Sequence, residues 1–158
     1  MRVRPLDFAV GLVLLVVAVV ALRALQAHGP SLVMLPNPVL APGAINPEVT
    51  QANINQTICV SGWTKTVRPP TSYTSALKVQ QMAAYGLPGS PSDYQEDHLI
   101  SLEMGGSPND PRNLWPEPYP RAAAVDTIEN ELNARICSGE LTLAQARRQE
   151  SELKHRHG

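Results

Sequence analysis

The sequence predicts an α+β protein with a short ββα hairpin–helix core surrounded by additional helices and preceded by one N-terminal transmembrane or signal helix. Three patterns predict this class. An uninterrupted apolar block stands near the N-terminus, two short apolar runs flank a glycine pair, and several segments carry apolar residues at helical spacing. We therefore expect three parts: a signal anchor or signal peptide over residues 1–27, a proline-rich linker over 28–45 and a folded domain over 46–158.

The apolar block occupies residues 8–22 and contains no charged residue. A helix of this length rises about 22 Å, short of the roughly 30 Å hydrocarbon core, but apolar neighbours extend the segment to residues 6–25. Arg2 and Arg4 precede it, which predicts that the rest of the chain crosses the membrane. Residues 25–27 match a cleavage site poorly, which favours an anchor, with the domain in the periplasm or outside the cell, over the alternative of a secreted protein.

The two cysteines, Cys59 and Cys137, both lie in the part of the chain that is predicted to be exported. An oxidising compartment favours their pairing, and a disulfide that closes a loop of this length contributes about 4 kcal/mol in the chain-entropy model. Two separate buried thiols are the alternative. Neither cysteine has a second cysteine or a histidine at ligand spacing, which argues against a cysteine-based zinc site.

After Ala27 the chain carries ten Lys and Arg residues against thirteen Asp and Glu residues, a net charge of −3. This balance argues against a protein that coats nucleic acid by bulk charge. It is compatible with a local basic groove in which a metal ion supplies further positive charge.

Residues 28–47 carry five prolines, so we expect this part of the chain to be either an extended tether or an arm that wraps the domain. The run Asn46-Pro47-Glu48 has the form of a helix start and predicts a helix over residues 47–58. The pair Pro69-Pro70 predicts that residues 61–70 form a loop without a helix. Ser72 is then expected to cap a helix that stops at Gly86.

Two short strands are predicted on either side of a glycine-rich connection that contains Gly105-Gly106 and a polar turn. A longer helix is predicted over residues 121–138, where apolar residues recur at helical spacing. Thr142 and Gln145 have the spacing of a capping box for a short last helix. The charged residues 154–157 are expected to be solvated at the frayed end of that helix.

The stretch Glu96-Asp97-His98 leads through Leu102-Glu103-Met104-Gly105-Gly106 to Asn113-Leu114-Trp115. This arrangement resembles the HNH endonucleases of the His-Me finger superfamily. In that family an acidic residue and a histidine end a first strand, a glycine-rich loop follows, and an asparagine stabilises the loop. The close match spans residues 93–118. The resemblance implies a ββα-metal fold and the hydrolysis of phosphodiester bonds.

Phosphodiester cleavage needs a base for water, stabilisation of charge on the phosphate and help for the leaving oxygen. The resemblance implies that His98 is the catalytic base, and an ordinary pKa near 6.5 suits that role. It implies that Asp97 binds a divalent metal ion, for which we expect Mg²⁺, with Mn²⁺ or Zn²⁺ as alternatives. Asn113, which we group with the catalytic residues, would bridge the loop and hold His98 in register.

A third metal ligand in the family comes from the helix after the second strand. Asn133 occupies that position, and Glu129, one turn earlier on the same face, is a second candidate. A solvated face on which Asn133 is merely tolerated is the alternative. Two departures from the family stand out: Ser101 replaces the usual proline, and no histidine lies between His98 and His155. The second departure implies either an asparagine-containing metal site or a degraded one.

We expect Trp115 to fill the core rather than to stack on a base. The first functional hypothesis is an exported, metal-dependent endonuclease that acts on DNA without sequence specificity and is attached to the membrane by residues 6–25. The alternative is a catalytically inactive, membrane-anchored HNH-like domain that binds DNA or a partner protein. A small disulfide-stapled structural protein would leave the spacing of Asp97, His98 and Asn113 to chance. The sequence leaves the oligomeric state open.

Overall fold

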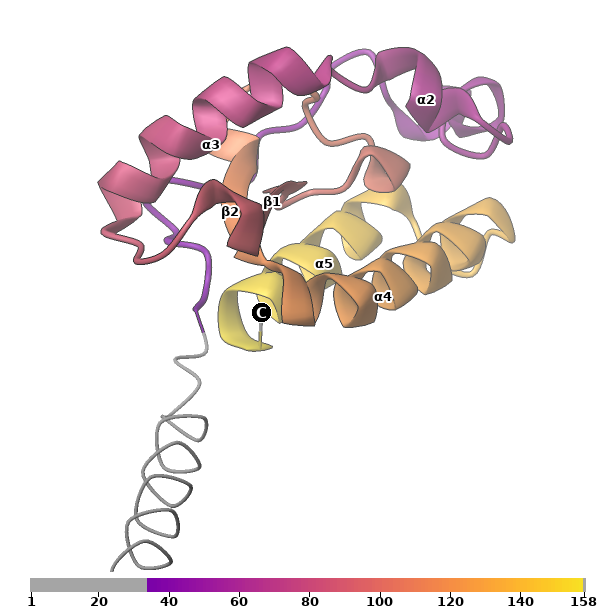
Figure 1. Cartoon of the computed structure of the whole chain (residues 1–158). Helices are drawn as coiled ribbons and strands as arrows, with labels where there is room; N and C mark the ends of the chain where they lie inside the picture. Colours follow the sequence, from indigo (N-terminus) through magenta and orange to yellow (C-terminus); the bar gives the residue numbers. More distant parts are fainter. Residues whose placement is uncertain (1–33, 158) are drawn as a thin grey trace, which may run out of the picture. The chain divides into compact units, whose positions relative to one another are not determined.

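The structure is a computed structural model that describes residues 34–157, apart from the side chains of Pro120 and His157 (Figure 1). The predicted anchor or signal peptide and the start of the linker lie outside the described residues. Within residues 34–157, no helix combines the length and the hydropathy of a membrane span.

The centre of the fold is a two-stranded antiparallel sheet of β1 (Tyr94–His98) and β2 (Leu114–Pro118). His98 pairs with Leu114, and Asp97 pairs with Trp115. The connection contains two 3₁₀ turns, η3 (Leu102–Met104) and η4 (Pro111–Asn113), on either side of the glycine pair. The α+β class and the two strands with a glycine-rich connection are therefore confirmed.

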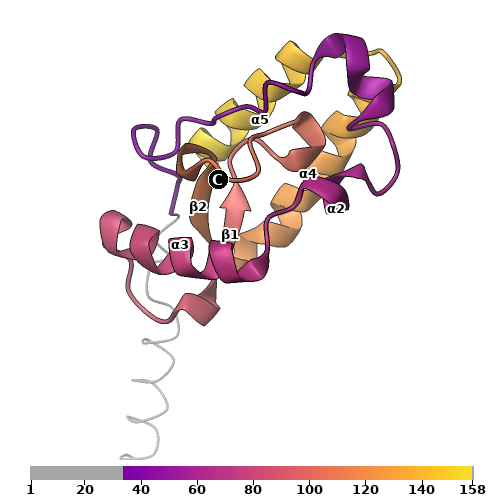
Figure 2. The ribbon, with the colours of Figure 1, turned by 90° about the horizontal axis from the view of Figure 1, so that it is seen from above.

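Helices cover the hairpin on two sides. Figures 1 and 2 show α3 (Thr71–Tyr85) on one side of the strands and the pair α4 (Tyr119–Cys137) and α5 (Leu143–His157) on the other. The helix predicted over residues 121–138 is α4, which begins two residues earlier. The helix α3 ends as predicted at Gly86, whose φ of 65° is one that glycine adopts readily. It begins after Pro70, however, and Ser72 does not cap it.

Two predictions about the first half of the domain are wrong. The segment predicted as a helix over residues 47–58 forms only a 3₁₀ helix, η1 (Gln51–Gln56), because the backbone at Thr50 is extended (φ −122°, ψ 161°) and interrupts any helix that starts at Pro47. The loop predicted over residues 61–70 contains a short helix, α2 (Trp63–Val67). The proline pair ends this helix at Arg68 instead of excluding it, because proline constrains only itself and the residue before it.

The last helix differs from its prediction at its end. The capping box is confirmed: the Thr142 N–H donates to Gln145 Oε1 (2.9 Å), and the Gln145 N–H donates to Thr142 Oγ1 (3.2 Å). The expectation that residues 154–157 are solvated is wrong for Lys154, which is only 3% exposed. The helix α5 packs this part of its length against the hairpin and α4, where acidic side chains receive the ammonium group.

The core gathers apolar side chains from residues 49–58 around η1, the loop between the strands, α4 and α5, with Met104, Ile136 and Ala146 completely buried. Trp115 is also completely buried, which confirms that it fills the core. Cys59 and Cys137 form the predicted disulfide, so neither is free to bind zinc. The disulfide indicates an oxidising compartment.

The end of the predicted linker wraps the domain. Ala41 is completely buried, and Ile45 pairs with Gly106 in an isolated antiparallel bridge. The Asn46 N–H donates to the Gly105 carbonyl, and the Ser107 N–H donates to the Ala44 carbonyl. The arm therefore braces the glycine pair from outside, and the folded part begins before residue 46.

Candidate functional site

A polar cavity of about 240 Å³ opens beside the end of β1. Its wall is formed by β1, the turn η3, one face of α4 and the residue that follows α2. Five carboxylates, one guanidinium and one imidazole line it: Glu96, Asp97, Glu103, Asp126 and Glu129, with Arg68 and His98. Asp97 and His98 both reach the cavity, although successive strand residues point to opposite faces, because β1 ends at His98.

His98 is a buried side chain whose orientation is set by one contact. Its Nε2 lies 3.1 Å from the carbonyl oxygen of Pro108. A carbonyl can only accept, so Nε2 carries the hydrogen and Nδ1 is left to accept a proton. Burial lowers the pKa of His98 below its ordinary value, and the nearby Asp97 offsets this effect only in part. The ring is therefore neutral at pH 7, which is the state that a general base needs.

Asn113 joins the two sides of the loop, as expected. Its Nδ2 donates to the carbonyls of Ile100 and Ser107, both at 2.9 Å, and its Oδ1 accepts from the Ile100 N–H at 2.9 Å. The side chain is completely buried. A Cβ on Gly106 would lie 1.8 Å from the Ile100 carbonyl oxygen and 2.7 Å from Asn113 Nδ2, so only glycine fits there. The hydrogen bonds of Asn113 and the close approach at Gly106 therefore fix the shape of the loop that follows His98.

Behind the cavity wall, Lys154 lies in a cluster of acidic groups. Its Nζ donates to Asp97 Oδ2 at 3.0 Å, to Glu129 Oε1 at 2.5 Å and to the His98 carbonyl at 2.5 Å. Glu150 Oε1 lies 3.7 Å away. Burial opposes the charge on Lys154, but the three carboxylates outweigh burial and raise its pKa above the ordinary value. The lysine is therefore a fixed buried cation that joins α5 to β1 and α4.

Two other glutamates of the cavity, Glu96 and Glu103, have carboxylate oxygens without a partner among the described residues. Both oxygens of Glu96, and Oε2 of Glu103, are enclosed without a hydrogen bond. Burial raises the pKa of Glu96 to about 8 and also raises that of Glu103. Arg68 is the one basic side chain on the wall. The cavity is therefore not a basic groove, and its charge suits a cation better than an isolated phosphate.

The side chains of the cavity can be compared with the ligands that a divalent metal ion such as Mg²⁺ prefers. Among the described residues, no group of three His, Cys, Asp or Glu side chains converges closely enough to hold a metal. Mg²⁺, however, is usually bound through one or two carboxylates, with water and substrate phosphates completing its shell. Asp97 and Glu129 are joined through Lys154 and both line the cavity, beside the unpartnered oxygens of Glu96. These residues fit a hydrated, oxygen-preferring ion.

Asn133 does not lie among the residues that line the cavity. Its Nδ2 donates to the Glu103 carbonyl at 2.9 Å and to the Ile58 carbonyl at 3.2 Å. The amide therefore ties α4 to the turn η3 and to the segment before Cys59. Of the residues predicted from the sequence, the structure brings Asp97, His98 and Glu129 together, places Asn113 behind them, and uses Asn133 for packing.

The backbone of Ser101 has a structural role behind the cavity. Its φ of −60° and ψ of 158° would suit proline, but its N–H donates to Glu150 Oε1 at 3.0 Å. A proline has no N–H and could not make this bond. The Ser101 N–H therefore stabilises the buried carboxylate of Glu150, which flanks Lys154.

Sequence reasoning missed several residues of the site, notably Arg68, Glu150 and Lys154. A signal for the last two was present, because Leu143, Ala146, Glu150 and Lys154 follow a helical spacing of three and four residues. Charged residues in that pattern predict a solvated edge unless acidic partners from other segments are known. No comparable sequence signal exists for Arg68.

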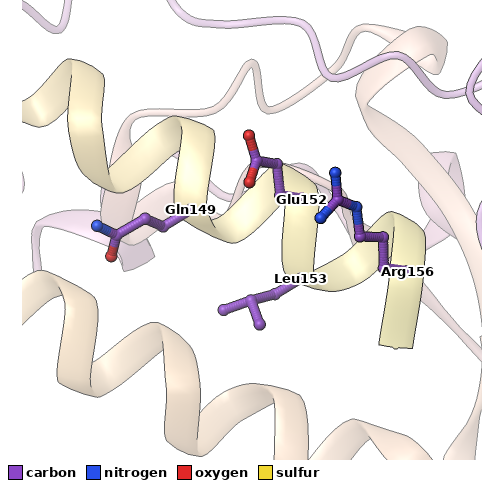
Figure 3. Close-up of a pocket in the computed structure, with 4 residues that line it drawn as sticks. All are labelled: Gln149, Glu152, Leu153 and Arg156. Carbon is purple, nitrogen blue, oxygen red and sulfur yellow. The ribbon is translucent and has the colours of Figure 1, made fainter.

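A second hollow lies along α5 (Figure 3) and is lined by Gln149, Glu152, Leu153 and Arg156. All four side chains come from one helix face. Glu152 and Arg156 are both exposed, one turn apart and opposite in charge. This hollow brings no side chains together from different elements, so the cavity at His98 is the stronger candidate.

The cavity at His98 thus combines a neutral imidazole with an open nitrogen, two carboxylates bound to a buried ammonium, and one guanidinium. Such a set can remove a proton from water and bind a phosphate together with a divalent cation. No protein-family model, no curated protein and no solved structure matches this chain.

Proposed function

We propose that the protein is a metal-dependent endonuclease of the HNH type that hydrolyses DNA phosphodiester bonds outside the cytoplasm. The observation that carries this proposal is the state of His98. Its Nε2 is engaged by the Pro108 carbonyl, its pKa is lowered by burial, and its ring lines a cavity shared with Asp97 and Glu129. The loop-bridging hydrogen bonds of Asn113 support it.

In this proposal His98 accepts a proton from water at Nδ1, which is the ring nitrogen without a partner among the described residues. Asp97 and Glu129 provide the carboxylate oxygens for Mg²⁺, or for Mn²⁺ or Zn²⁺. A bound ion of this kind supplies charge stabilisation for the phosphate and for the leaving oxygen. Arg68 is exposed and binds a phosphate oxygen of the DNA.

The charge of the cavity gives the proposal its metal dependence. The acidic side chains on the wall outnumber its one guanidinium, although burial keeps Glu96 largely protonated at pH 7, so a phosphate is expected to need a cation beside it. Contacts to the phosphate backbone carry no base information, so cleavage is expected to be independent of sequence.

The test is plasmid nicking by the purified protein in the presence of Mg²⁺ or Mn²⁺. We expect wild type to convert supercoiled plasmid to open-circular and linear forms, EDTA to stop the reaction, and His98→Ala to lower the rate by at least about a hundredfold. His155→Ala is the matched control, because His155 lies on α5 outside the cavity, and it should cut like wild type. Undiminished cutting by a folded His98→Ala protein would remove His98 from the mechanism.

The disulfide supports an extracytoplasmic location, and we propose that residues 6–25 anchor the domain at the outer side of the membrane. Mass spectrometry of the protein recovered from cells decides between anchor and signal peptide. An intact N-terminus in the membrane fraction supports the anchor, whereas a chain beginning near residue 28 indicates a secreted protein.

A second candidate is an HNH-like domain that binds DNA or a partner protein without cutting. The observation that favours it is Lys154, whose ammonium already compensates Asp97 and Glu129. This candidate predicts no nicking with any divalent ion and no heat in a calorimetric titration with Mn²⁺. Nicking that depends on His98 would eliminate it.

A further inference from the structure

We propose that Lys154 is a built-in cation of the site, which competes with a divalent metal ion for Asp97 and Glu129 and keeps the metal affinity of the wild-type protein low. Removing the ammonium alone should then turn these two carboxylates into a tighter divalent-ion site. The inference rests on the proposed function only in locating the metal at Asp97 and Glu129.

The contacts of Lys154 are those of a cation in an oxygen cage. Its three N–H donors are used by Asp97 Oδ2, Glu129 Oε1 and the carbonyl oxygen of His98. Two carboxylates and a backbone carbonyl are also a donor set that hard divalent ions accept. The ammonium comes from α5, while its acceptors belong to β1 and α4, so the cage is closed only when α5 is packed in place.

Burial prevents the Lys154 ammonium and a divalent ion from binding the same carboxylates together. The side chains of Lys154, Asp97 and Glu129 are 4%, 15% and 13% exposed, so water screens their charges poorly. A divalent ion at the same carboxylates would meet the positive charge of Lys154 at short range. The two cations therefore compete, and the covalently attached one is always present.

Lys154 has a further acidic neighbour, Glu150, which is itself fixed by a hydrogen bond from Ser101. Glu150 is 1% exposed, and its Oε1 accepts from the Ser101 N–H at 3.0 Å and lies 3.7 Å from Lys154 Nζ. This carboxylate does not line the cavity. Its negative charge partly neutralises the Lys154 ammonium from outside the cavity. Lys154 and Glu150 therefore form an ion pair one turn apart on α5.

The test is calorimetric titration of the full chain with Mn²⁺, comparing wild type with Lys154→Met, which keeps an unbranched side chain one atom shorter and removes its charge. We expect Lys154→Met to bind Mn²⁺ at least about tenfold more tightly than wild type. Lys154→Arg keeps the charge and should bind as weakly as wild type. In the double variant Lys154→Met/Asp97→Asn the gain should disappear.

The proposal is overturned if Lys154→Met binds Mn²⁺ no more tightly than wild type, or if the gain survives Asp97→Asn. Should Lys154→Met unfold without metal, thermal melts replace the titration. Stabilisation by Mn²⁺ of Lys154→Met, but not of Lys154→Met/Asp97→Asn, then supports the proposal, and the absence of such stabilisation contradicts it.

Plasmid nicking on the same proteins separates this inference from the proposed function. If wild type cuts in a His98-dependent manner while Lys154→Met gains no Mn²⁺ affinity, the role of Lys154 is wrong and the endonuclease stands. If Lys154→Met gains affinity while neither protein cuts, the endonuclease is wrong and the built-in cation stands.

Discussion

At the scale of single residues, the loop between the strands depends on one amide. Asn113 makes three hydrogen bonds of 2.9 Å to backbone groups of Ile100 and Ser107, and its side chain is completely buried. Each of those backbone groups lies where water has little access. An amide both donates and accepts, so no other short side chain satisfies all three.

We predict that Asn113→Ala lowers the free energy of unfolding by about 2 to 4 kcal/mol, because it leaves buried backbone groups unpaired. Urea denaturation followed by circular dichroism measures this loss. Asn109→Ala is the matched control, since Asn109 is exposed on the same connection, and it should change stability by no more than about 0.5 kcal/mol. Equal stabilities of the two variants would show that the amide does not hold the loop.

At the scale of elements, β2 runs directly into α4, and a buried carboxylate lies at the junction. Glu117 is completely buried, accepts a hydrogen bond from Gln95 Nε2 at 2.9 Å and lies 3.9 Å from Arg121. Burial raises the pKa of Glu117 to about 7, and the charge of Asp97 adds to the shift. The hairpin thus contains a group that is easier to protonate in the folded protein than in the unfolded chain.

The sign of the pH dependence follows from that difference. Between the unfolded value of 4.5 and about pH 7 the folded state binds more protons, so the contribution of Glu117 to stability falls as the pH rises. We predict that wild type loses up to about 3 kcal/mol more stability than Glu117→Gln between pH 4.5 and pH 8. Urea melts at both pH values measure this. Glu131→Gln, at an exposed position of α4, should keep the wild-type pH dependence. An unchanged dependence in Glu117→Gln would contradict the prediction.

Elements were predictable where their signals are local. The two strands, α3 to Gly86, α4 and the capping box of α5 all follow from residue spacing and end signals within a few positions. The segment over residues 47–58 was not, because Thr50 has an extended backbone and forms with Asn53 the capping box of a shorter helix that starts at Gln51. The short helix α2 begins at Trp63, directly after Gly62, whose φ of 81° is one that glycine adopts readily.

At the scale of the whole molecule, the disulfide joins the segment after η1 to the end of α4 across 78 positions. Most of the folded domain, including both strands and the loop, lies inside that covalent ring. The arm that contains Ala41 and Ile45 precedes the ring in the sequence and packs on the loop between the strands, with Ala41 completely buried. All residues that line the cavity lie inside the ring, whereas Glu150 and Lys154 on α5 lie beyond it.

We predict that the paired change Cys59→Ala/Cys137→Ala lowers the free energy of unfolding by about 4 kcal/mol, because the unfolded chain regains the entropy that the ring removes. Thermal and urea melts measure the loss. Treatment of wild type with a reducing agent should cause a similar decrease, whereas the paired variant should not respond to it. A wild-type protein that melts alike in oxidised and reduced form would contradict this role.

The sequence by itself determined the α+β class, the two strands and α4, because these depend on spacing and residue type. It favoured the cysteine pairing and a buried Trp115, and the bridging by Asn113 followed from the resemblance to HNH endonucleases. Only the tertiary structure decided that Lys154 is buried between Asp97 and Glu129, and that Asn133 serves packing rather than the cavity. Partners that lie 25 to 75 positions apart meet only when α5 and α4 pack on the hairpin. Whether a charged side chain is solvated or buried depends on which carboxylates and carbonyls that packing brings to it.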